Sequence, residues 1–258
     1  DTEPGVELHA AVGHAVTVGV LEEPDVRRGR GDDAVAVEHE AGDELELVGE
    51  HLLAVHHAVT VGVGENGDAI LGLALGAAIS GFVPIPEIQY LAYFHNACDQ
   101  IRGEACSLQF FSNGQYRNPM VMRVASLGYQ RGFGGHFHND NSITALRDIP
   151  SLVVGCPSRG DDAVTMLRSM TALAKVDGRV CAYLEPIALY MSKDLYETGD
   201  GLWQTRYPAP SEAMEIGSER TYFPENNDVV VFTFGNGVPM SLRAARQIED
   251  SLQWKVRV

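Results

Sequence analysis

The feature that most constrains the fold is an alternation of short apolar runs with longer helical patterns. Three apolar runs of five or six residues have the length of buried strands: Met120–Ala125, Leu152–Cys156 and Val180–Leu184. Between the last two, over Asp161–Lys175, apolar residues recur at helical spacing. Strands that alternate with helices predict a parallel α/β sheet, and we expect a three-layer fold.

Two helices and a strand are expected before these runs. Small apolar residues and glycines over Ala69–Gly81 are typical of a helix packed tightly on a sheet. We expect a short buried strand at Phe82–Pro86, ended by proline, and then one long helix over Glu87–Ser107. The later helix has an N-cap candidate in Ser158 or Asp161.

The last part of the chain predicts the start of a second α/β domain. A strand is expected at Val229–Phe234, a helix at Met240–Leu252, and another strand at Trp254–Val258. We therefore expect a first domain at residues 70–206, a linker at 207–228, and a truncated start of a C-terminal domain at 229–258.

Residues 1–69 differ in character from the rest. They hold no aromatic residue and six of the nine histidines, and residues 1–68 carry a net charge of −13 out of −16. A segment with so few large apolar residues is expected to be weakly ordered. Two other interpretations stay open: metal binding by its histidines, and translation of this part of the gene in a wrong reading frame.

Composition excludes several classes of function. No cluster of Lys and Arg suggests a nucleic-acid partner, and no apolar run approaches the ~20 residues that cross a bilayer. The start of the chain has no secretory pattern. The four cysteines lie far apart, which favours reduced thiols over a disulfide framework or a metal site and predicts a cytoplasmic protein.

An ordered set of motifs carries a resemblance to a known family. The motifs are Pro84–Tyr93 (PIPEIQYLAY), Asp99–Ala105 (DQIRGEA), Gly134–Asn141 (GGHFHNDN), Pro150–Pro157 (PSLVVGCP) and Leu184–Pro186 (LEP). This set resembles the beta-subunit-like, pyrimidine-binding half of the decarboxylating component of thiamine-diphosphate-dependent 2-oxo acid dehydrogenases. The histidine-rich motif is similar to the branch in which both halves are fused in one chain. Val229–Val258 resembles the start of the transketolase-type C-terminal domain.

The resemblance implies a fold, a cofactor and partners. The fold is the thiamine-diphosphate-binding type, and the reaction is oxidative decarboxylation with acyl transfer to a lipoyl group. Thiamine diphosphate lies between this half and a diphosphate-binding, alpha-like half, which supplies magnesium. The other partner is a lipoyl-bearing acyltransferase, and the assembly is a homodimer or heterotetramer. Alternatives are a transketolase-like or synthase activity with the same cofactor, or a non-catalytic interaction fragment.

The same resemblance points to particular residues. Tyr93 falls where the family places an aromatic ring against the pyrimidine, and His138 falls at the active-site histidine, with His136 as a possible helper. The glutamate that protonates the pyrimidine falls at Gly67 here. Because a glycine cannot supply an acid, the chain alone is expected to be inactive.

Three charged residues are expected to have structural roles. Glu87 and Asp99, on the predicted long helix, are expected to be paired or to cap an end of it. Arg123, at the end of a buried strand, is expected to be an ion-pair partner.

Overall fold

The main sheet of the computed structural model has six strands, in the spatial order β1-β2-β3-β4-β6-β5. The structure describes residues 18–20, 58–64, 67–128 and 138–258. The strands are parallel except β1, which runs antiparallel to β2. Their bounds are β1 Val18–Val20, β2 Ala58–Gly64, β3 Val83–Ile88, β4 Met120–Ser126, β5 Val153–Gly155 and β6 Val180–Pro186.

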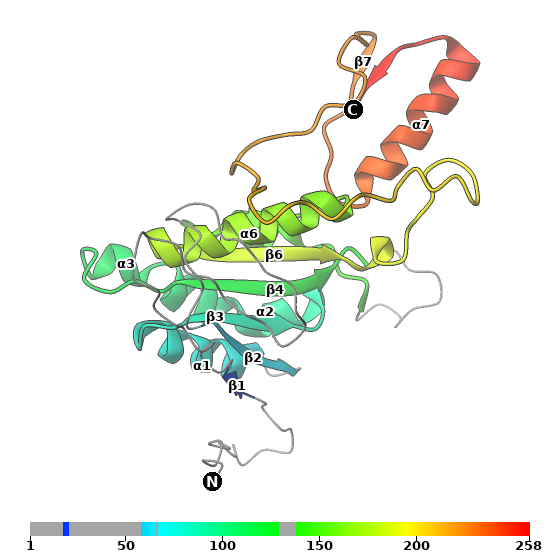
Figure 1. Cartoon of the computed structure of the whole chain (residues 1–258). Coiled ribbons are helices and arrows are strands. Elements are labelled where there is room, and N and C mark those ends of the chain that lie inside the picture. The colour runs from blue at the N-terminus through cyan, green and yellow to red at the C-terminus, as the bar shows by residue number, and fades with distance from the viewer. Residues whose placement is uncertain (1–17, 21–57, 65–66, 129–137) are drawn as a thin grey trace, which may run out of the picture.

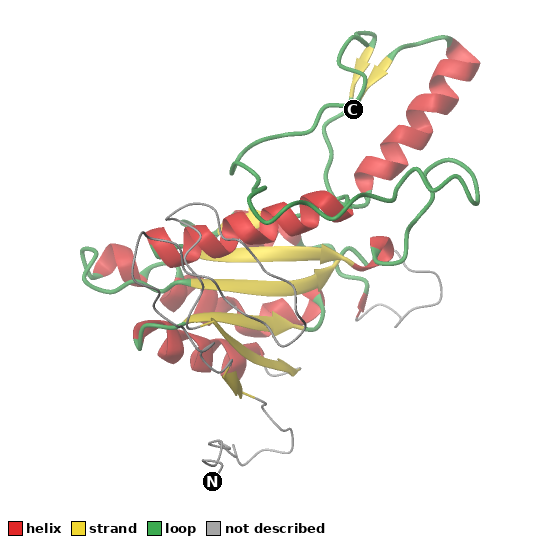
Figure 2. Ribbon diagram, viewed as in Figure 1, coloured by secondary structure: helices red, strands yellow, loops and turns green. Residues whose placement is uncertain are grey.

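The two faces of the sheet are covered by different helices. Helices α1 (Gly67–Ile79) and α2 (Leu91–Asp99) and the π-helix Gln100–Ala105 pack on one face. Helix α6 (Gly160–Asp177) packs on the other face, so the domain has three layers (Figures 1 and 2). The predicted α/β architecture with a parallel sheet is therefore confirmed.

Alternate residues of the central strands enter separate cores. On β4, Met120, Met122 and Val124 belong to the core beneath α1 and α2, whereas Val121 faces α6. All four side chains are at most 1% exposed. Because successive side chains of a strand point to opposite faces, a strand buried on both sides must be apolar at nearly every position. This requirement explains the continuous apolar runs in the sequence.

Strand β3 and the helix after it differ from the prediction. The strand continues through Pro84 and Pro86 to Ile88, and helix α2 begins only at Leu91. Pairing with β4 involves only Glu87 and Ile88, so the prolines precede the stretch paired with that strand, although they lie within the stretch that pairs with β2. Glu87 is therefore a strand residue, although its spacing from later apolar residues suggested a helix.

The expected long helix is divided into two pieces, and a further short helix follows its predicted end. Helix α2 continues into the π-helix Gln100–Ala105, and a short helix, α3, covers Leu108–Phe111. The wider π-helical turn still buries Ile101 and Ala105, which keeps this segment in the core. Periodicity identified the apolar positions correctly but did not reveal the change of helix type.

Helix α6 begins without either predicted cap. Its N-cap position is Arg159, which makes no side-chain capping hydrogen bond. Asp161 and Asp162 lie in the first turn, where negative charge is favourable to the helix dipole. The helix ends at Gly178, whose φ of 70° is the left-handed conformation that glycine adopts at helix ends.

The sheet begins earlier in the chain than residue 70. Strand β2, at residues 58–64, pairs in parallel with β3, and helix α1 starts at Gly67. The expected domain start at residue 70 therefore lies inside α1. Most other residues of the 1–69 segment lie outside the described residues, and the further boundaries at 206 and 228 stay predictions.

The C-terminal unit has the expected strand–helix–strand order. Strands β7 (Val229–Val230) and β8 (Val256–Arg257) are parallel and are connected through helix α7 (Gly237–Leu252). The amide of Asn236 donates to the Leu127 carbonyl at 2.8 Å, which ties this unit to the end of β4. Residues 190–228, all described, contain no helix or strand.

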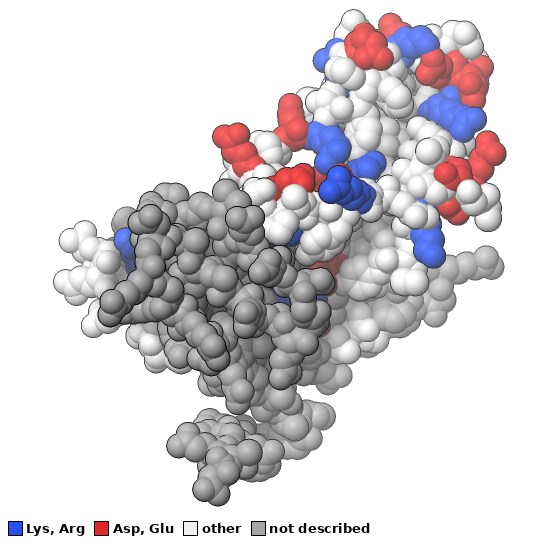
Figure 3. Space-filling model, in the orientation of Figure 1, with Lys and Arg blue, Asp and Glu red and all other residues white. Residues whose placement is uncertain are grey.

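Charges of both signs are interspersed over the C-terminal unit in the view of Figure 3. The described residues of that face show no uniform basic surface of the kind that phosphate backbones require. Within the described part of the chain, no helix is both long and apolar enough to cross a membrane.

The core beneath α1 and α2 gives a direct test of the packing. Leu184 of β6 is fully buried in it, so Leu184→Ala is expected to lower the free energy of unfolding by about 2–5 kcal/mol. Urea unfolding followed by circular dichroism measures this change. Leu202→Ala, at a 54% exposed position, serves as the control and should cost less than about 1 kcal/mol. Equal losses would contradict the described core.

The cysteines give a second test. All four are free thiols, and burial raises the pKa of Cys106, Cys156 and Cys181 to about 12. Because the thiolate is the reactive form, these three should resist iodoacetamide at pH 8 in the folded chain and react fully in urea. Mass spectrometry of peptides after timed alkylation measures the difference. Fast labelling of Cys106 in the folded chain would show that its site is open.

Candidate functional site

The candidate site lies where β3 ends and helix α2 begins. Tyr90 has an extended backbone (φ −147°, ψ 148°) and is the last residue before the helix. Its carbonyl accepts a hydrogen bond from the Tyr93 amide at 2.9 Å, which closes the first turn. The carboxyl ends of parallel strands are the usual location of binding sites in α/β sheets.

Three aromatic rings meet at this point. The Tyr93 hydroxyl lies 3.2 Å from Nε2 of His138, and the His138 ring lies 4.5 Å from the Tyr90 ring, edge to face. A hydroxyl donates to an unprotonated ring nitrogen and accepts from a protonated one, so the contact suits either tautomer of the imidazole. The structure therefore brings together two residues that the sequence had assigned to one site, Tyr93 and His138.

The third predicted residue, His136, lies outside the described residues. Tyr90 was not singled out from the sequence, although it belongs to the Pro84–Tyr93 motif. The signal that could have identified it is its spacing of three residues from Tyr93 across the start of a helix. The two rings lie 5.8 Å apart, edge to face, at the first turn of the helix.

A second contact joins the same two segments. His95 Nε2 lies 2.9 Å from Oδ2 of Asp140, and Oδ1 of Asp140 accepts the Ser142 amide at 2.7 Å and the Ser142 hydroxyl. Partial burial alone would raise the pKa of Asp140, but the hydrogen bonds from Ser142 and His95 outweigh it and lower that pKa. Asp140 therefore remains ionised at pH values somewhat below the ordinary pKa of an aspartic acid side chain.

A charged cluster lies on neighbouring strands. Arg123 donates to Glu185 at 2.6 and 3.1 Å and to Glu87 at 2.8 Å, and the Tyr190 hydroxyl donates to Glu185 at 2.6 Å. The bond to Glu185 raises the pKa of Arg123 despite partial burial, and burial together with Glu185 raises that of Tyr190. The expected ion-pair roles of Arg123 and Glu87 are confirmed. Asp99, by contrast, is exposed and makes no capping bond.

The sheet separates this charged cluster from the aromatic rings. Arg123 alternates with Met122 and Val124, so it points to the α6 face, and Glu185 does the same next to Leu184. Tyr93 belongs to α2, on the opposite face. The cluster consequently joins strands β3, β4 and β6, and its charges do not contact the rings.

Position 67 contains no acid and has little room for one. Gly67 is buried at the start of α1, and a Cβ atom there would lie 3.0 Å from the Ala97 Cβ and 3.3 Å from the Tyr93 carbonyl. The next residue, Asp68, is exposed. Position 67 therefore does not fit the proton transfer that activates thiamine diphosphate in the family that the motifs resemble.

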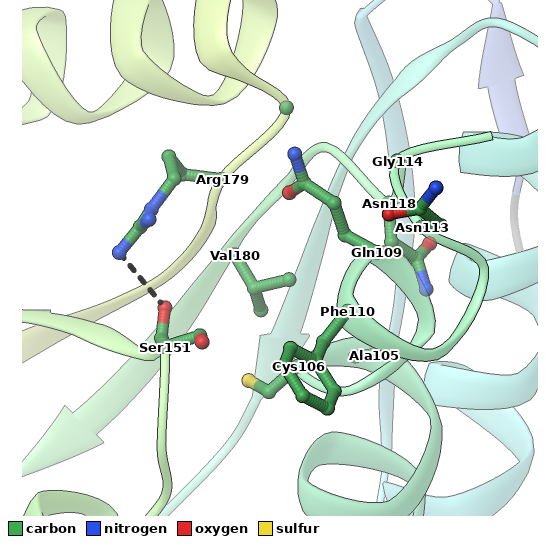
Figure 4. A pocket seen from close by; sticks show the side chains of 11 residues that line it. Ala105, Cys106, Gln109, Phe110, Asn113, Gly114, Asn118, Ser151, Arg179 and Val180 are labelled. Atoms are coloured by element: carbon green, nitrogen blue, oxygen red, sulfur yellow. Dashed lines mark hydrogen bonds between the residues drawn. The ribbon is translucent and has the colours of Figure 1, made fainter. Parts of the chain in front are cut away.

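A pocket of about 410 Å³ lies at the other end of the strands. Its lining includes Cys106, Gln109, Asn118 and Arg179 (Figure 4), and Arg179 donates to the Ser151 carbonyl at 3.3 Å. It contains none of the predicted site residues. Among the described residues, no group of three or more His, Cys, Asp or Glu side chains is arranged to hold a metal ion.

The fold and these residues define a parallel α/β domain with an aromatic and histidine site at the carboxyl end of β3. Comparison with known families then gives a match of residues 7–196 to the family described as "Transketolase, pyrimidine binding domain". The chain belongs to this family. The match starts far before Ile70, so it extends into the segment that the sequence analysis had set apart.

Curated relatives indicate which members of this family the chain resembles. The chain is 32% identical over 193 residues to the 3-methyl-2-oxobutanoate dehydrogenase subunit beta of Mycobacterium tuberculosis, covering 74% of this chain and 49% of that protein. It is 31% identical over 183 residues to the pyruvate dehydrogenase E1 component subunit beta of Staphylococcus epidermidis, covering 69% and 50%. The chain thus spans about half the length of these relatives.

A comparison with solved structures gave a "Split gene transketolase, inactive beta4 tetramer". It is 16% identical, covers 74% of this chain and 53% of that one, and has a TM-score of 0.46. Likeness at this level adds nothing to the sequence match. The wrong-frame origin of residues 1–69 stays a hypothesis, which the encoding DNA can test.

The ring cluster gives a testable prediction. Tyr93→Phe keeps the ring but removes the hydroxyl beside His138. It should lower the free energy of unfolding by about 0.5–1.5 kcal/mol and change the environment of the His138 imidazole. Long-range ¹⁵N–¹H spectra of the His138 ring measure that change. Tyr116→Phe, a half-exposed position, is the control. If the His138 signals are the same in both variants, the contact is absent in solution.

Proposed function

We propose that this chain is the pyrimidine-binding half of a thiamine-diphosphate-dependent 2-oxo acid dehydrogenase. Family membership and the two dehydrogenase beta subunits among its relatives support this proposal. The observation that supports this proposal best is the contact between Tyr93 and His138. It lies at the carboxyl end of the strands, where ligands of α/β sheets usually bind. The cytoplasm is the proposed location, because the four thiols are unpaired.

The chain's own residues suit two tasks. The rings of Tyr90 and Tyr93 offer flat surfaces to an aminopyrimidine. His138, in contact with both, can hold or release a proton at Nε2, the atom that faces the Tyr93 hydroxyl. Thiamine diphosphate, when bound, supplies the carbanion chemistry that decarboxylates 2-oxo acids. Tyr93 thus acts in positioning His138 as well as in contacting the pyrimidine.

Activity requires more than this chain. The diphosphate and its magnesium would be held by an alpha-like half, and the acyl group would pass to a lipoyl-bearing acyltransferase. The assembly would be a homodimer or a heterotetramer. Because the isolated chain would lack the diphosphate-binding half, and Gly67 stands where the resemblance places the activating glutamate, we propose that the isolated chain is inactive.

A non-catalytic role is the second candidate, and the same Gly67 favours it. In that case the chain would bind its partner half without supporting turnover. A transketolase-like activity would share the cofactor but would transfer ketol groups between sugars. Reductive acylation of a lipoyl domain and ketol transfer are therefore the two assays that distinguish the catalytic alternatives.

Binding gives the first test. The chain is mixed with the alpha subunit of a related 3-methyl-2-oxobutanoate dehydrogenase, and thiamine diphosphate with magnesium is titrated by calorimetry. Tight binding is expected only when both halves are present, because each contributes one side of the site. Binding of equal strength to the isolated chain would contradict the division into two halves, and no binding to the mixture would favour a non-catalytic role.

Turnover tests the role of His138. In a mixture that shows acyl transfer, His138→Ala should lower kcat by about 10²–10⁴-fold, the usual contribution of a positioned acid or base. Asp148→Asn is the control, because Asp148 is exposed and pairs with its neighbour Arg147. Unchanged acyl transfer in His138→Ala would overturn this role. Absence of acyl transfer in every mixture would favour the non-catalytic alternative.

A further inference from the structure

Two parallel contacts join helix α2 to the segment that carries His138. Tyr93 contacts His138, and two residues further along both segments His95 contacts Asp140. Each contact spans 45 residues of sequence. The second contact involves neither ring of the site, so it fixes the segment independently of the site's own residues.

Asp140 connects this segment to the core on its other side. Its Oδ1 atom accepts the amide and hydroxyl of Ser142, the residue just before helix α5 (Ile143–Arg147). Within α5, Leu146 is fully buried in the core beneath α1 and α2. One carboxylate is therefore attached to α2 through Oδ2 and to the start of a core-anchored helix through Oδ1.

We propose that Asp140 is a positioning residue that, together with His95, holds His138 against Tyr93. This inference rests on the proposed function only for its consequence in catalysis. The geometric part concerns where the His138 ring lies. The two parts can therefore fail separately.

The exposure of the pair determines which effect should be measured. The side chains of His95 and Asp140 are 47% and 21% exposed. Ion pairs in such surroundings contribute little to global stability, because water and salt screen them. Loss of the pair should thus leave the unfolding midpoint nearly unchanged. Its effect should appear locally, as a more frequent opening of residues 138–142.

The histidine side of the pair offers a conservative substitution. His95→Gln keeps an N–H donor at a similar distance from the backbone, whereas His95→Ala removes it. If hydrogen bonding to Asp140 is what matters, Gln should preserve the position of His138 and Ala should not. Because His95 is on the surface, neither change threatens folding.

The test uses the full 258-residue chain and two readouts. The variants are Asp140→Ala, His95→Ala and His95→Gln, with Asp148→Ala as the control carboxylate. The first readout is the ¹⁵N–¹H spectrum of the His138 ring, and the second is hydrogen exchange in the peptide that covers residues 138–147. Urea unfolding is followed in parallel.

Asp140→Ala and His95→Ala should move the His138 signals toward those of a solvated imidazole. His95→Ala should also speed exchange in the peptide about tenfold, the effect of losing one charge-assisted hydrogen bond, and Asp140→Ala should speed it at least as much because it also removes the two bonds from Ser142. The His138 signals and exchange rates of His95→Gln and Asp148→Ala should stay close to those of the parent chain. His138 signals and exchange rates in Asp140→Ala and His95→Ala that match those of Asp148→Ala would overturn the proposal. If Asp140→Ala does not fold, the comparison of His95→Ala with His95→Gln decides.

In a reconstituted enzyme, a positioning residue affects turnover more than substrate binding. Asp140→Ala should lower kcat about tenfold with little change in KM for the 2-oxo acid. If His138→Ala leaves acyl transfer unchanged, the proposed function fails, and the spectra of the isolated chain still decide whether Asp140 positions the ring. If the spectra do not respond to either substitution, the positioning role fails whatever the enzyme does.

Discussion

Burial of the central strands on both faces is the constraint on which the rest of this structure depends. Strands β4 and β6 each place alternate residues in two separate cores. A shift of pairing by one residue would exchange the two sets of side chains, and each core is shaped for its own set. The register Met122↔Ala182 and Val124↔Leu184 is therefore fixed by packing, and the ends of the strands are fixed with it.

Fixed strand ends explain where polar chemistry can occur. Beyond Val121 the apolar pattern on the α6 face of β4 gives way to Arg123, which pairs with Glu185 and Glu87 on the two neighbouring strands. On the opposite face, β3 ends at Ile88 and the chain turns through Tyr90 into α2. One edge of the sheet thus has a structural ion cluster on one face and an aromatic site on the other. Because the side chains alternate, residues as near in sequence as Glu87 and Tyr90 take part in unrelated interactions.

The sequence predicted the architecture better than the element boundaries. Strands β4 and β6 could be recognised, because burial on both faces requires a continuous apolar run, and helix α6 could be recognised by its helical spacing of apolar residues. The apolar run at β5 also forms a strand, but this strand lies at the edge of the sheet and is only partly buried. The strand nature of Glu87 could not, since its pairing with Arg123 depends on a residue 36 positions away. The π-helix was hidden for a similar reason, as its apolar positions also satisfy an ordinary helix. Tyr93 and His138 were identified only through the family resemblance, and His95 and Asp140 were missed because nothing local marks a contact across 45 residues.

The two prolines of β3 have a consequence for how the site forms. Proline has a fixed φ, so Pro84 and Pro86 restrict the unfolded chain to extended conformations immediately before Tyr90. The residue before each proline is also biased toward extended backbone, which leaves this strand little conformational freedom to lose on folding. The strand that leads to the aromatic rings therefore loses less conformational entropy on folding than a strand without prolines would. The segment on the other side of the site, which contributes His138, has to lose its conformational freedom through its tertiary contacts.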